Sequence, residues 1–180
     1  MRQPLTAETL QAFIRALAVK AKTSTRVYLV GGASAVLLGW RSSTIDIDLK
    51  IIPESDEILR ALPRLKEDLH INIELASPDD FIPALPGWQE RSTFIQQEGK
   101  LSVYHYDFYA QALAKIVRGH EIDQSDVKQF LEKGLVEPKR LRQLFSAIED
   151  QIYRYPELSP DAFRNELERV LRNYDGDDSE

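Results

Sequence analysis

The chain contains no cysteine among its 180 residues. It can therefore form neither a disulfide bond nor a metal site with thiolate ligands. Its histidines, His70, His105 and His120, lack the close spacing typical of metal ligands, so we expect each to be structural or solvated. These absences exclude disulfide-stabilised scaffolds and zinc sites with cysteine ligands.

Long apolar runs are also missing. No stretch approaches the roughly 18 consecutive apolar residues of a transmembrane helix. The first residues do not show the basic segment followed by an apolar one that marks a secretory signal. We therefore expect a cytoplasmic protein that makes no contact with a membrane.

The chain has fewer basic than acidic residues, and its formal net charge is −6. Residues 175–180 hold four acids and no base, so the rest of the chain has 25 of the 29 acids against 23 bases. A nearly neutral body differs from strongly basic nucleic-acid binders and favours a small or locally docked substrate. The acidic residues 175–180 are expected to be a disordered tail.

Residues 27–49 carry the most informative pattern: a strand, a glycine turn, a short helix, a polar loop and a second strand. Residues 27–30 are a run of strand-forming apolar residues, which Gly31 and Gly32 interrupt. A glycine turn that opens a helix presents backbone N–H groups, which can hold a phosphate. The pattern therefore predicts a phosphate-binding turn.

The second strand of this stretch contains two aspartates. Ile45, Ile47 and Leu49 alternate with Asp46 and Asp48, and residues i and i+2 of a strand point to the same face. We expect the aliphatic side chains to face the core and both carboxylates to face the opposite side. Adjacent carboxylates repel unless a cation lies between them, and Mg²⁺ prefers such oxygen ligands. The alternative is a solvated strand edge without a metal.

The combination of these features resembles a known superfamily. A strand, Gly31-Gly32, thirteen further residues and then Asp46-Ile47-Asp48 is similar to the nucleotidyltransferases of the DNA polymerase β type. The closer resemblance is to the AbiEii toxin-like and MenT-like branch, in which an arginine and a serine or threonine precede the aspartates. The resemblance implies that Asp46 and Asp48 bind Mg²⁺ or Mn²⁺ and that a group of residues contacts the nucleotide phosphates, namely Gly31, Gly32, Ser34, Arg41 and Ser43.

Residues 70–76 form the next predicted strand, in which Asn72 and Glu74 share the polar face. Members of the superfamily commonly carry a third carboxylate on a strand beside the aspartate pair. Glu74 matches this position best, as a third metal-binding and catalytic residue, and Asn72 is the weaker candidate. The alternative is a surface glutamate on a half-buried strand.

A second informative stretch lies in the helical half of the chain, at residues 107–127. Lys115 and Arg118 are three residues apart, as are Asp123 and Asp126, so the four side chains predict an ion pair between helices. The resemblance adds a function, because AbiEii-like enzymes carry a lysine, an arginine and an Asp-x-x-Asp turn after the sheet. It implies that Lys115 approaches the triphosphate, that Asp126 orients the triphosphate or a neighbouring base, and that Arg118 helps to bind the nucleotide.

The expected fold is α+β, with a mixed nucleotidyltransferase-type sheet, flanking helices and a C-terminal helical bundle. We divide the chain into a sheet domain at residues 1–106, a helical region at 107–174 and the acidic tail at 175–180. Periodicity and breaker residues predict strands at 27–30, 45–49, 70–76, 93–97 and 101–106, and helices at 6–22, 33–38, 55–68, 109–118, 125–133, 138–154 and 160–174.

The expected activity is transfer of a nucleoside monophosphate from an NTP to a hydroxyl group of RNA, such as tRNA, or of a protein. The resemblance implies a toxin of a toxin–antitoxin system, with an antitoxin as partner. A catalytically idle relative that serves as a binding or antitoxin-like partner is the alternative from another class. In a third interpretation the motif is fortuitous, and Asp46 and Asp48 are plain surface residues.

Overall fold

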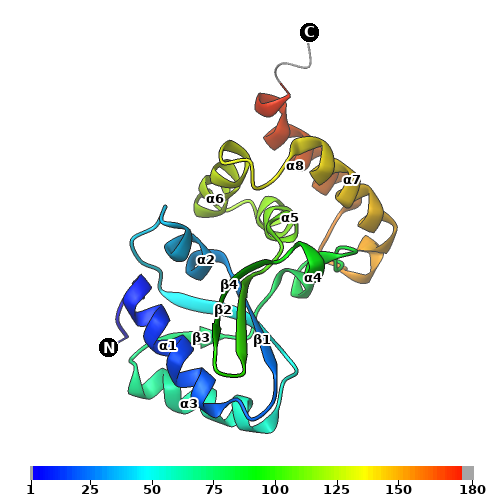
Figure 1. Cartoon of the computed structure of the whole chain (residues 1–180). Helices are drawn as coiled ribbons and strands as arrows, with labels where there is room; N and C mark the ends of the chain where they lie inside the picture. The colour runs from blue at the N-terminus through cyan, green and yellow to red at the C-terminus, as the bar shows by residue number, and fades with distance from the viewer. Residues whose placement is uncertain (1, 176–180) are drawn as a thin grey trace. The chain divides into compact units, whose positions relative to one another are not determined.

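The computed structural model describes residues 2–175, apart from the side chains of residues 121 and 122, and it divides into two compact units (Figure 1). The first unit holds residues 2–77 and 92–106, and the second holds residues 78–91 and 107–175. Residues 78–91, which the sequence division placed in the sheet domain, thus belong to the helical unit. Residues 176–180 of the predicted acidic tail lie outside the described residues.

A five-stranded mixed sheet forms the centre of the first unit, in the order β3–β2–β1–β5–β4. Strand β1 pairs with β2 in antiparallel and with β5 in parallel orientation, while β2 and β3 are parallel. The strands predicted at 93–97 and 101–106 are present as the antiparallel pair β4 and β5. The strands are β1 (Thr25–Val30), β2 (Asp46–Ile52), β3 (Asn72–Glu74), β4 (Thr93–Glu98) and β5 (Leu101–His105).

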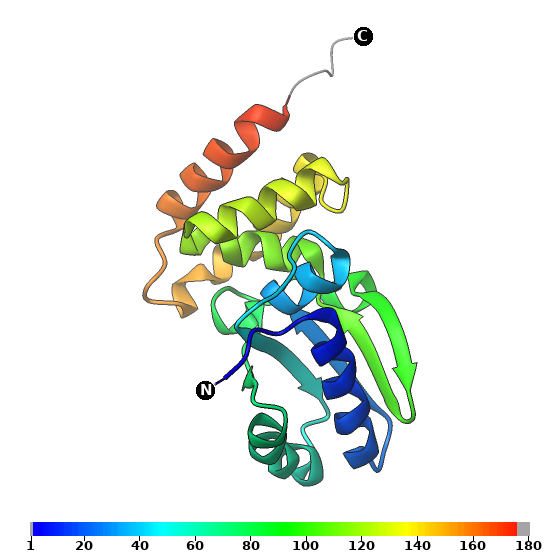
Figure 2. The ribbon, with the colours of Figure 1, turned by 90° about the vertical axis from the view of Figure 1, so that its left-hand side faces the viewer.

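Three helices flank this sheet, namely α1 (Ala7–Lys20), α2 (Gly31–Leu38) and α3 (Asp56–Asp68). The hydroxyl groups of Thr6 and Ser55 cap α1 and α3 by accepting a hydrogen bond from a first-turn N–H group. Gln11 of α1 donates a hydrogen bond of 2.9 Å to Gln96 of β4, and Figure 2 shows this helix beside the hairpin. The predicted mixed sheet with flanking helices is therefore confirmed.

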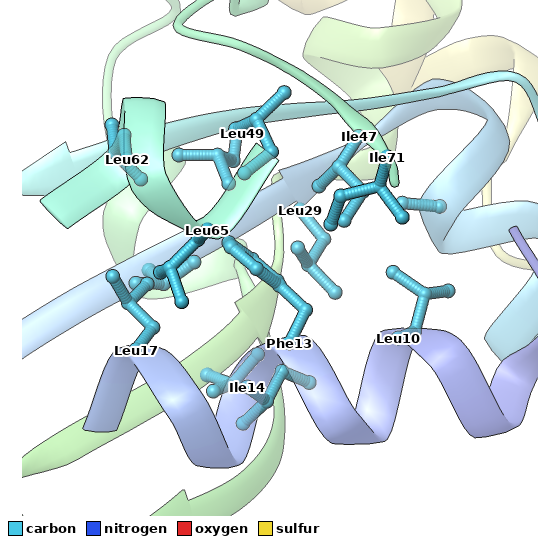
Figure 3. Packing of buried hydrophobic residues seen from close by; sticks show 14 of the residues in the cluster. Leu10, Phe13, Ile14, Leu17, Leu29, Ile47, Leu49, Leu62, Leu65 and Ile71 are labelled. Atoms are coloured by element: carbon cyan, nitrogen blue, oxygen red, sulfur yellow. The ribbon is translucent and has the colours of Figure 1, made fainter. Parts of the chain in front are cut away.

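The core of the first unit lies between the sheet and its helices (Figure 3). Phe13 and Leu17 of α1 are fully buried, because the apolar positions of this helix recur on one side. Each such side chain contributes about 1.5–3 kcal/mol to stability relative to an exposed one. Residues of the strands that share this core are Val27, Leu29, Ile47, Leu49, Ile51, Ile73, Leu101 and Val103. This packing fixes which face of β2 turns away from the core.

The second unit is helical, and its mostly aliphatic core contains two phenylalanine pairs, Phe145 against Phe163 and Phe108 against Phe130. Its helices are α4 (Trp88–Arg91), α5 (Phe108–Arg118), α6 (Glu121–Glu132), α7 (Pro138–Ile148) and α8 (Pro160–Leu171). Short 3₁₀ segments cover Pro78–Asp80, Glu149–Arg154 and Arg172–Tyr174. Within residues 2–175, none of the helices has the length and apolar character needed to cross a membrane.

Candidate active site

The glycine turn is the first turn of a helix. Helix α2 begins at Gly31, two residues earlier than the predicted start, so both glycines belong to it. Gly31 has a φ of +60°, a left-handed conformation that glycine adopts without strain. The residue before it, Val30, makes no side-chain hydrogen bond to the helix start. The first N–H groups of a helix have no intrahelical partner, so this turn is suited to an anion such as phosphate.

The loop that precedes Asp46 packs directly on this turn. A Cβ atom at Gly32 would lie only 2.0 Å from Oγ1 of Thr44 and 3.3 Å from a guanidinium nitrogen of Arg41. No side chain other than hydrogen fits at position 32 unless Thr44 moves. The structure therefore brings Arg41, predicted to contact phosphate, against the glycine turn. Ser43 is half-buried in the same loop, and its phosphate contact stays a prediction.

Strand β2 carries the aspartate pair on the face that turns away from the core. Ile47 and Leu49 are buried, and Asp46 and Asp48 alternate with them at intermediate exposure, as the period of two predicts. The expectation for Ile45 is wrong, because the strand begins only at Asp46 and Ile45 is 77% exposed. A residue outside the strand is not bound to its alternation.

The aspartate pair adjoins both the glycine turn and the third strand. Asp48 lies opposite Val30 of β1, and its Oδ2 is 3.7 Å from the place that a Cβ at Gly31 would occupy. Across the parallel pair, Asp48 lies opposite Glu74. The carboxylate of Asp48 thus adjoins the start of α2, and Glu74 lies beside it in register. Glu74 itself is exposed.

The side-chain amide of Asn72 connects the carboxylates of Asp46 and Glu74. Nδ2 of Asn72 donates to Oδ1 of Asp46 at 2.6 Å and to Oε1 of Glu74 at 3.1 Å. The guanidinium group of Arg2 donates to Oδ1 of the same amide. Asp46, Asn72 and Glu74 therefore form one hydrogen-bonded group on this face of the sheet.

The chemistry of these donors fits a hard divalent cation. Asp46, Asp48 and Glu74 offer only oxygen ligands, which Mg²⁺ and Mn²⁺ prefer. Among the residues that the structure describes, however, no three Asp, Glu, His or Cys side chains lie close enough together to hold a metal ion. Mg²⁺ is commonly held by one or two carboxylates together with substrate phosphates, and the aspartate pair beside the glycine turn suits that mode.

Ser34, the third residue predicted to contact phosphate, lies in the core instead. It is 0% exposed, and its hydroxyl donates to the carbonyl oxygen of Leu29 at 3.2 Å. Nδ1 of His105 lies 2.8 Å from the same Oγ, and the tautomer of the ring decides which of the two atoms donates. Burial lowers the pKa of His105 to about 4, which keeps the ring neutral at pH 7. This geometry does not support the predicted phosphate contact, and we leave Ser34 out of the proposed site.

The predicted ion pair between helices is confirmed in the second unit. Nζ of Lys115 on α5 lies 2.8 Å from Oδ2 of Asp126 and 3.2 Å from Oδ1 of Asp123, both on α6. The side chains of Lys115 and Asp126 are 8% and 2% exposed, so the pair is shielded from water. Arg118 joins the group at 3.5 Å from Asp123. These contacts account for the spacing structurally, while the nucleotide contacts implied by the resemblance stay predictions.

Sequence reasoning missed the roles of two residues, Thr44 beside the glycine turn and Asn72 beside the aspartate pair. Thr44 restricts position 32 to glycine, and no pattern around it signals this role. Asn72 is recognised as a polar residue on the right face, but its two hydrogen bonds depend on the register of β2 against β3. A single sequence does not reveal that register.

Residues 7–174 match the family described as "Nucleotidyltransferase of unknown function (DUF6036)". The chain belongs to the DUF6036 family. This DUF6036 chain is also similar to the crystal structure of an antigenic nucleotidyltransferase-like protein from Paracoccidioides brasiliensis, with 16% sequence identity and a TM-score of 0.50. The similarity covers 95% of this chain and 100% of the other one and, at that identity, shows the fold alone. No curated protein matches the sequence.

Proposed function

We propose that this DUF6036 protein is a metal-dependent nucleotidyltransferase that transfers NMP from an NTP to a hydroxyl group of RNA or protein. The observation that carries the proposal is the meeting of a helix start and an aspartate pair. Oδ2 of Asp48 lies 3.7 Å from the Cβ position of Gly31, so a phosphate at the turn would adjoin the carboxylates. Family membership supports the same reaction class.

The proposed reaction forms a bond between the acceptor oxygen and the α-phosphorus and breaks the bond between the α-phosphorus and the bridging oxygen. Pyrophosphate leaves with that oxygen, and the acceptor proton passes to solvent. Asp46 and Asp48 would hold Mg²⁺ or Mn²⁺, which when bound neutralises the triphosphate charge. Glu74 would complete the carboxylate set on the acceptor side. A preorganised site of this kind stabilises the charge that develops on the departing pyrophosphate.

Further residues would bind the nucleotide. The first-turn N–H groups of α2 and the guanidinium group of Arg41 are suited to phosphate oxygens. The resemblance also implies nucleotide-binding roles for Lys115, Arg118 and Asp126. The same resemblance to the AbiEii-like and MenT-like branch supports a toxin role, with tRNA or a protein as acceptor and an antitoxin as partner.

The test is transfer of label from each α-³²P NTP, added separately with Mg²⁺, to total RNA and to lysate protein. Asp46→Asn and Asp48→Asn preserve shape and remove charge, while Asp68→Asn changes an exposed aspartate of α3 as a matched control. We expect labelling by wild type and the control but not by the two site variants. Equal labelling by Asp48→Asn would contradict the proposed role of the aspartate pair.

A catalytically idle relative that acts as a binding partner is the second candidate. One observation favours it, because the described residues contain no cluster of three metal-ligating side chains. An idle protein can still bind Mg²⁺ and an NTP. The absence of label with every nucleotide, from protein that binds Mg-ATP in calorimetric titration, would favour this candidate over the enzyme.

A further inference from the structure

Asn72 lies between two carboxylates of the candidate site and hydrogen-bonds to both. It opens β3 directly opposite Asp46, and its Nδ2 is 2.6 Å from Oδ1 of Asp46 and 3.1 Å from Oε1 of Glu74. An amide NH₂ group has two protons, so both bonds can form at once. The neutral amide thereby holds two negative groups toward each other without adding a counter-charge.

The amide orientation is itself fixed from the other side. The guanidinium group of Arg2 donates to Oδ1 of Asn72, and this bond keeps the NH₂ end directed at the carboxylates. A flipped amide would present Oδ1 to Asp46, and two acceptors would then face each other. Residue 2 thus acts on Asp46 through Asn72, although it lies 70 positions away from the asparagine in sequence.

We propose that Asn72 is a positioning residue, which orients the carboxylates of Asp46 and Glu74 for the divalent cation while Arg2 sets the direction of its amide. The inference rests on the metal site of the proposed function. Each carboxylate accepts the amide bond through one oxygen and has a second oxygen to offer as a ligand. Hydrogen bonds to the ligands of a metal typically change its affinity by about 10- to 100-fold.

The experiment measures the affinity of the full chain for Mn²⁺ alone, from the loss of the free-ion EPR signal. Asn72→Val removes the amide and keeps a strand-favouring side chain, and Gln97→Val makes the same change at an exposed position of β4. We expect the Kd for Mn²⁺ to rise about 10-fold or more in Asn72→Val and to stay at the wild-type value in Gln97→Val. The urea midpoint of each variant, measured in parallel, reports whether it is folded.

Two further variants distinguish a failure of the positioning role of Asn72 from a failure of the metal site itself. Arg2→Met alters an exposed side chain near the start of the chain and should weaken Mn²⁺ binding, by less than Asn72→Val does. Asp46→Asn should abolish it. A wild-type Kd in both Asn72→Val and Arg2→Met, with binding lost in Asp46→Asn, would overturn the role of Asn72 and leave the metal site standing. Binding by Asp46→Asn that equals wild type would overturn the metal site itself.

Discussion

Nδ1 of His105, at the end of β5, lies 2.8 Å from Oγ of Ser34 inside α2. The serine hydroxyl in turn donates to the carbonyl oxygen of Leu29, which lies opposite His105 in the parallel pair of β1 and β5. These buried hydrogen bonds connect the C-terminal ends of β1 and β5 to the helix that begins at Gly31. These hydrogen bonds stabilise the start of α2 without contact to a nucleotide.

The burial of His105 predicts a pH-dependent stability. Burial lowers the pKa of His105 from 6.5 to about 4, so between these values the unfolded chain binds more protons than the folded one. The contribution is complete above pH 6.5 and is lost as the pH falls toward 4, by up to about 3 kcal/mol. Urea unfolding of wild type and His105→Asn at intervals from pH 7 to pH 4 measures it.

The His105→Asn variant places an amide, which can donate or accept a hydrogen bond, near the position of Nδ1 but does not titrate. The difference in unfolding free energy between wild type and His105→Asn should therefore shift by about 3 kcal/mol across this window. His120→Asn changes an exposed histidine and should follow wild type. A constant difference between wild type and His105→Asn would refute the buried neutral histidine.

The second prediction concerns the contact between Gly32 and Thr44. Gly32→Ala places a Cβ 2.0 Å from Oγ1 of Thr44, so the loop before Asp46 has to move. We expect a loss of about 1–3 kcal/mol in unfolding free energy, which urea denaturation measures. Gly32→Ala combined with Thr44→Gly removes the clash and should be more stable than the sum of the single effects allows. Strict additivity would show that the two side chains do not meet.

The third prediction concerns the buried charges of the second unit. Lys115→Met leaves Asp123 and Asp126 buried without the ammonium group that lies 3.2 and 2.8 Å from them. Removing one partner of a buried pair typically costs about 3–5 kcal/mol, and urea unfolding should show that loss. Lys128→Met breaks only an exposed pair with Glu132 on α6 and should cost less than about 1 kcal/mol. Equal midpoints for the two variants would contradict the structural role of Lys115.

Sequence reasoning was most successful where one periodicity determines the structure. The alternation around Asp46 and Asp48 predicts their common face, because a strand with one buried face has only one acceptable register of side chains. The spacing of Lys115 and Asp126 likewise predicts their ion pair. Both features depend on residues close together in sequence.

The sequence-based predictions fail where the structure depends on an unusual backbone conformation or on residues far apart in sequence. The sequence pattern predicts that the helix begins after the two glycines, yet the φ of +60° at Gly31 lets the chain enter α2 at that residue. The direction of Ser34 depends on His105, which reaches it from another strand 71 positions away. The two hydrogen bonds of Asn72 depend in the same way on the long-range register of β2 against β3. None of these relationships leaves a local pattern.

The central claim is that the protein transfers a nucleotide rather than a terminal phosphate. The most direct measurement compares the same NTP carrying ³²P at the α or at the γ position. Each is incubated with the protein, Mg²⁺ and the unlabelled acceptor, either RNA or lysate protein. Nucleotidyl transfer predicts that only the α label reaches the acceptor and that the γ label is released as pyrophosphate. Asp48→Asn should show neither the labelled acceptor nor the labelled pyrophosphate. Acceptor label from the γ position, or label that persists in Asp48→Asn, would contradict the proposed reaction.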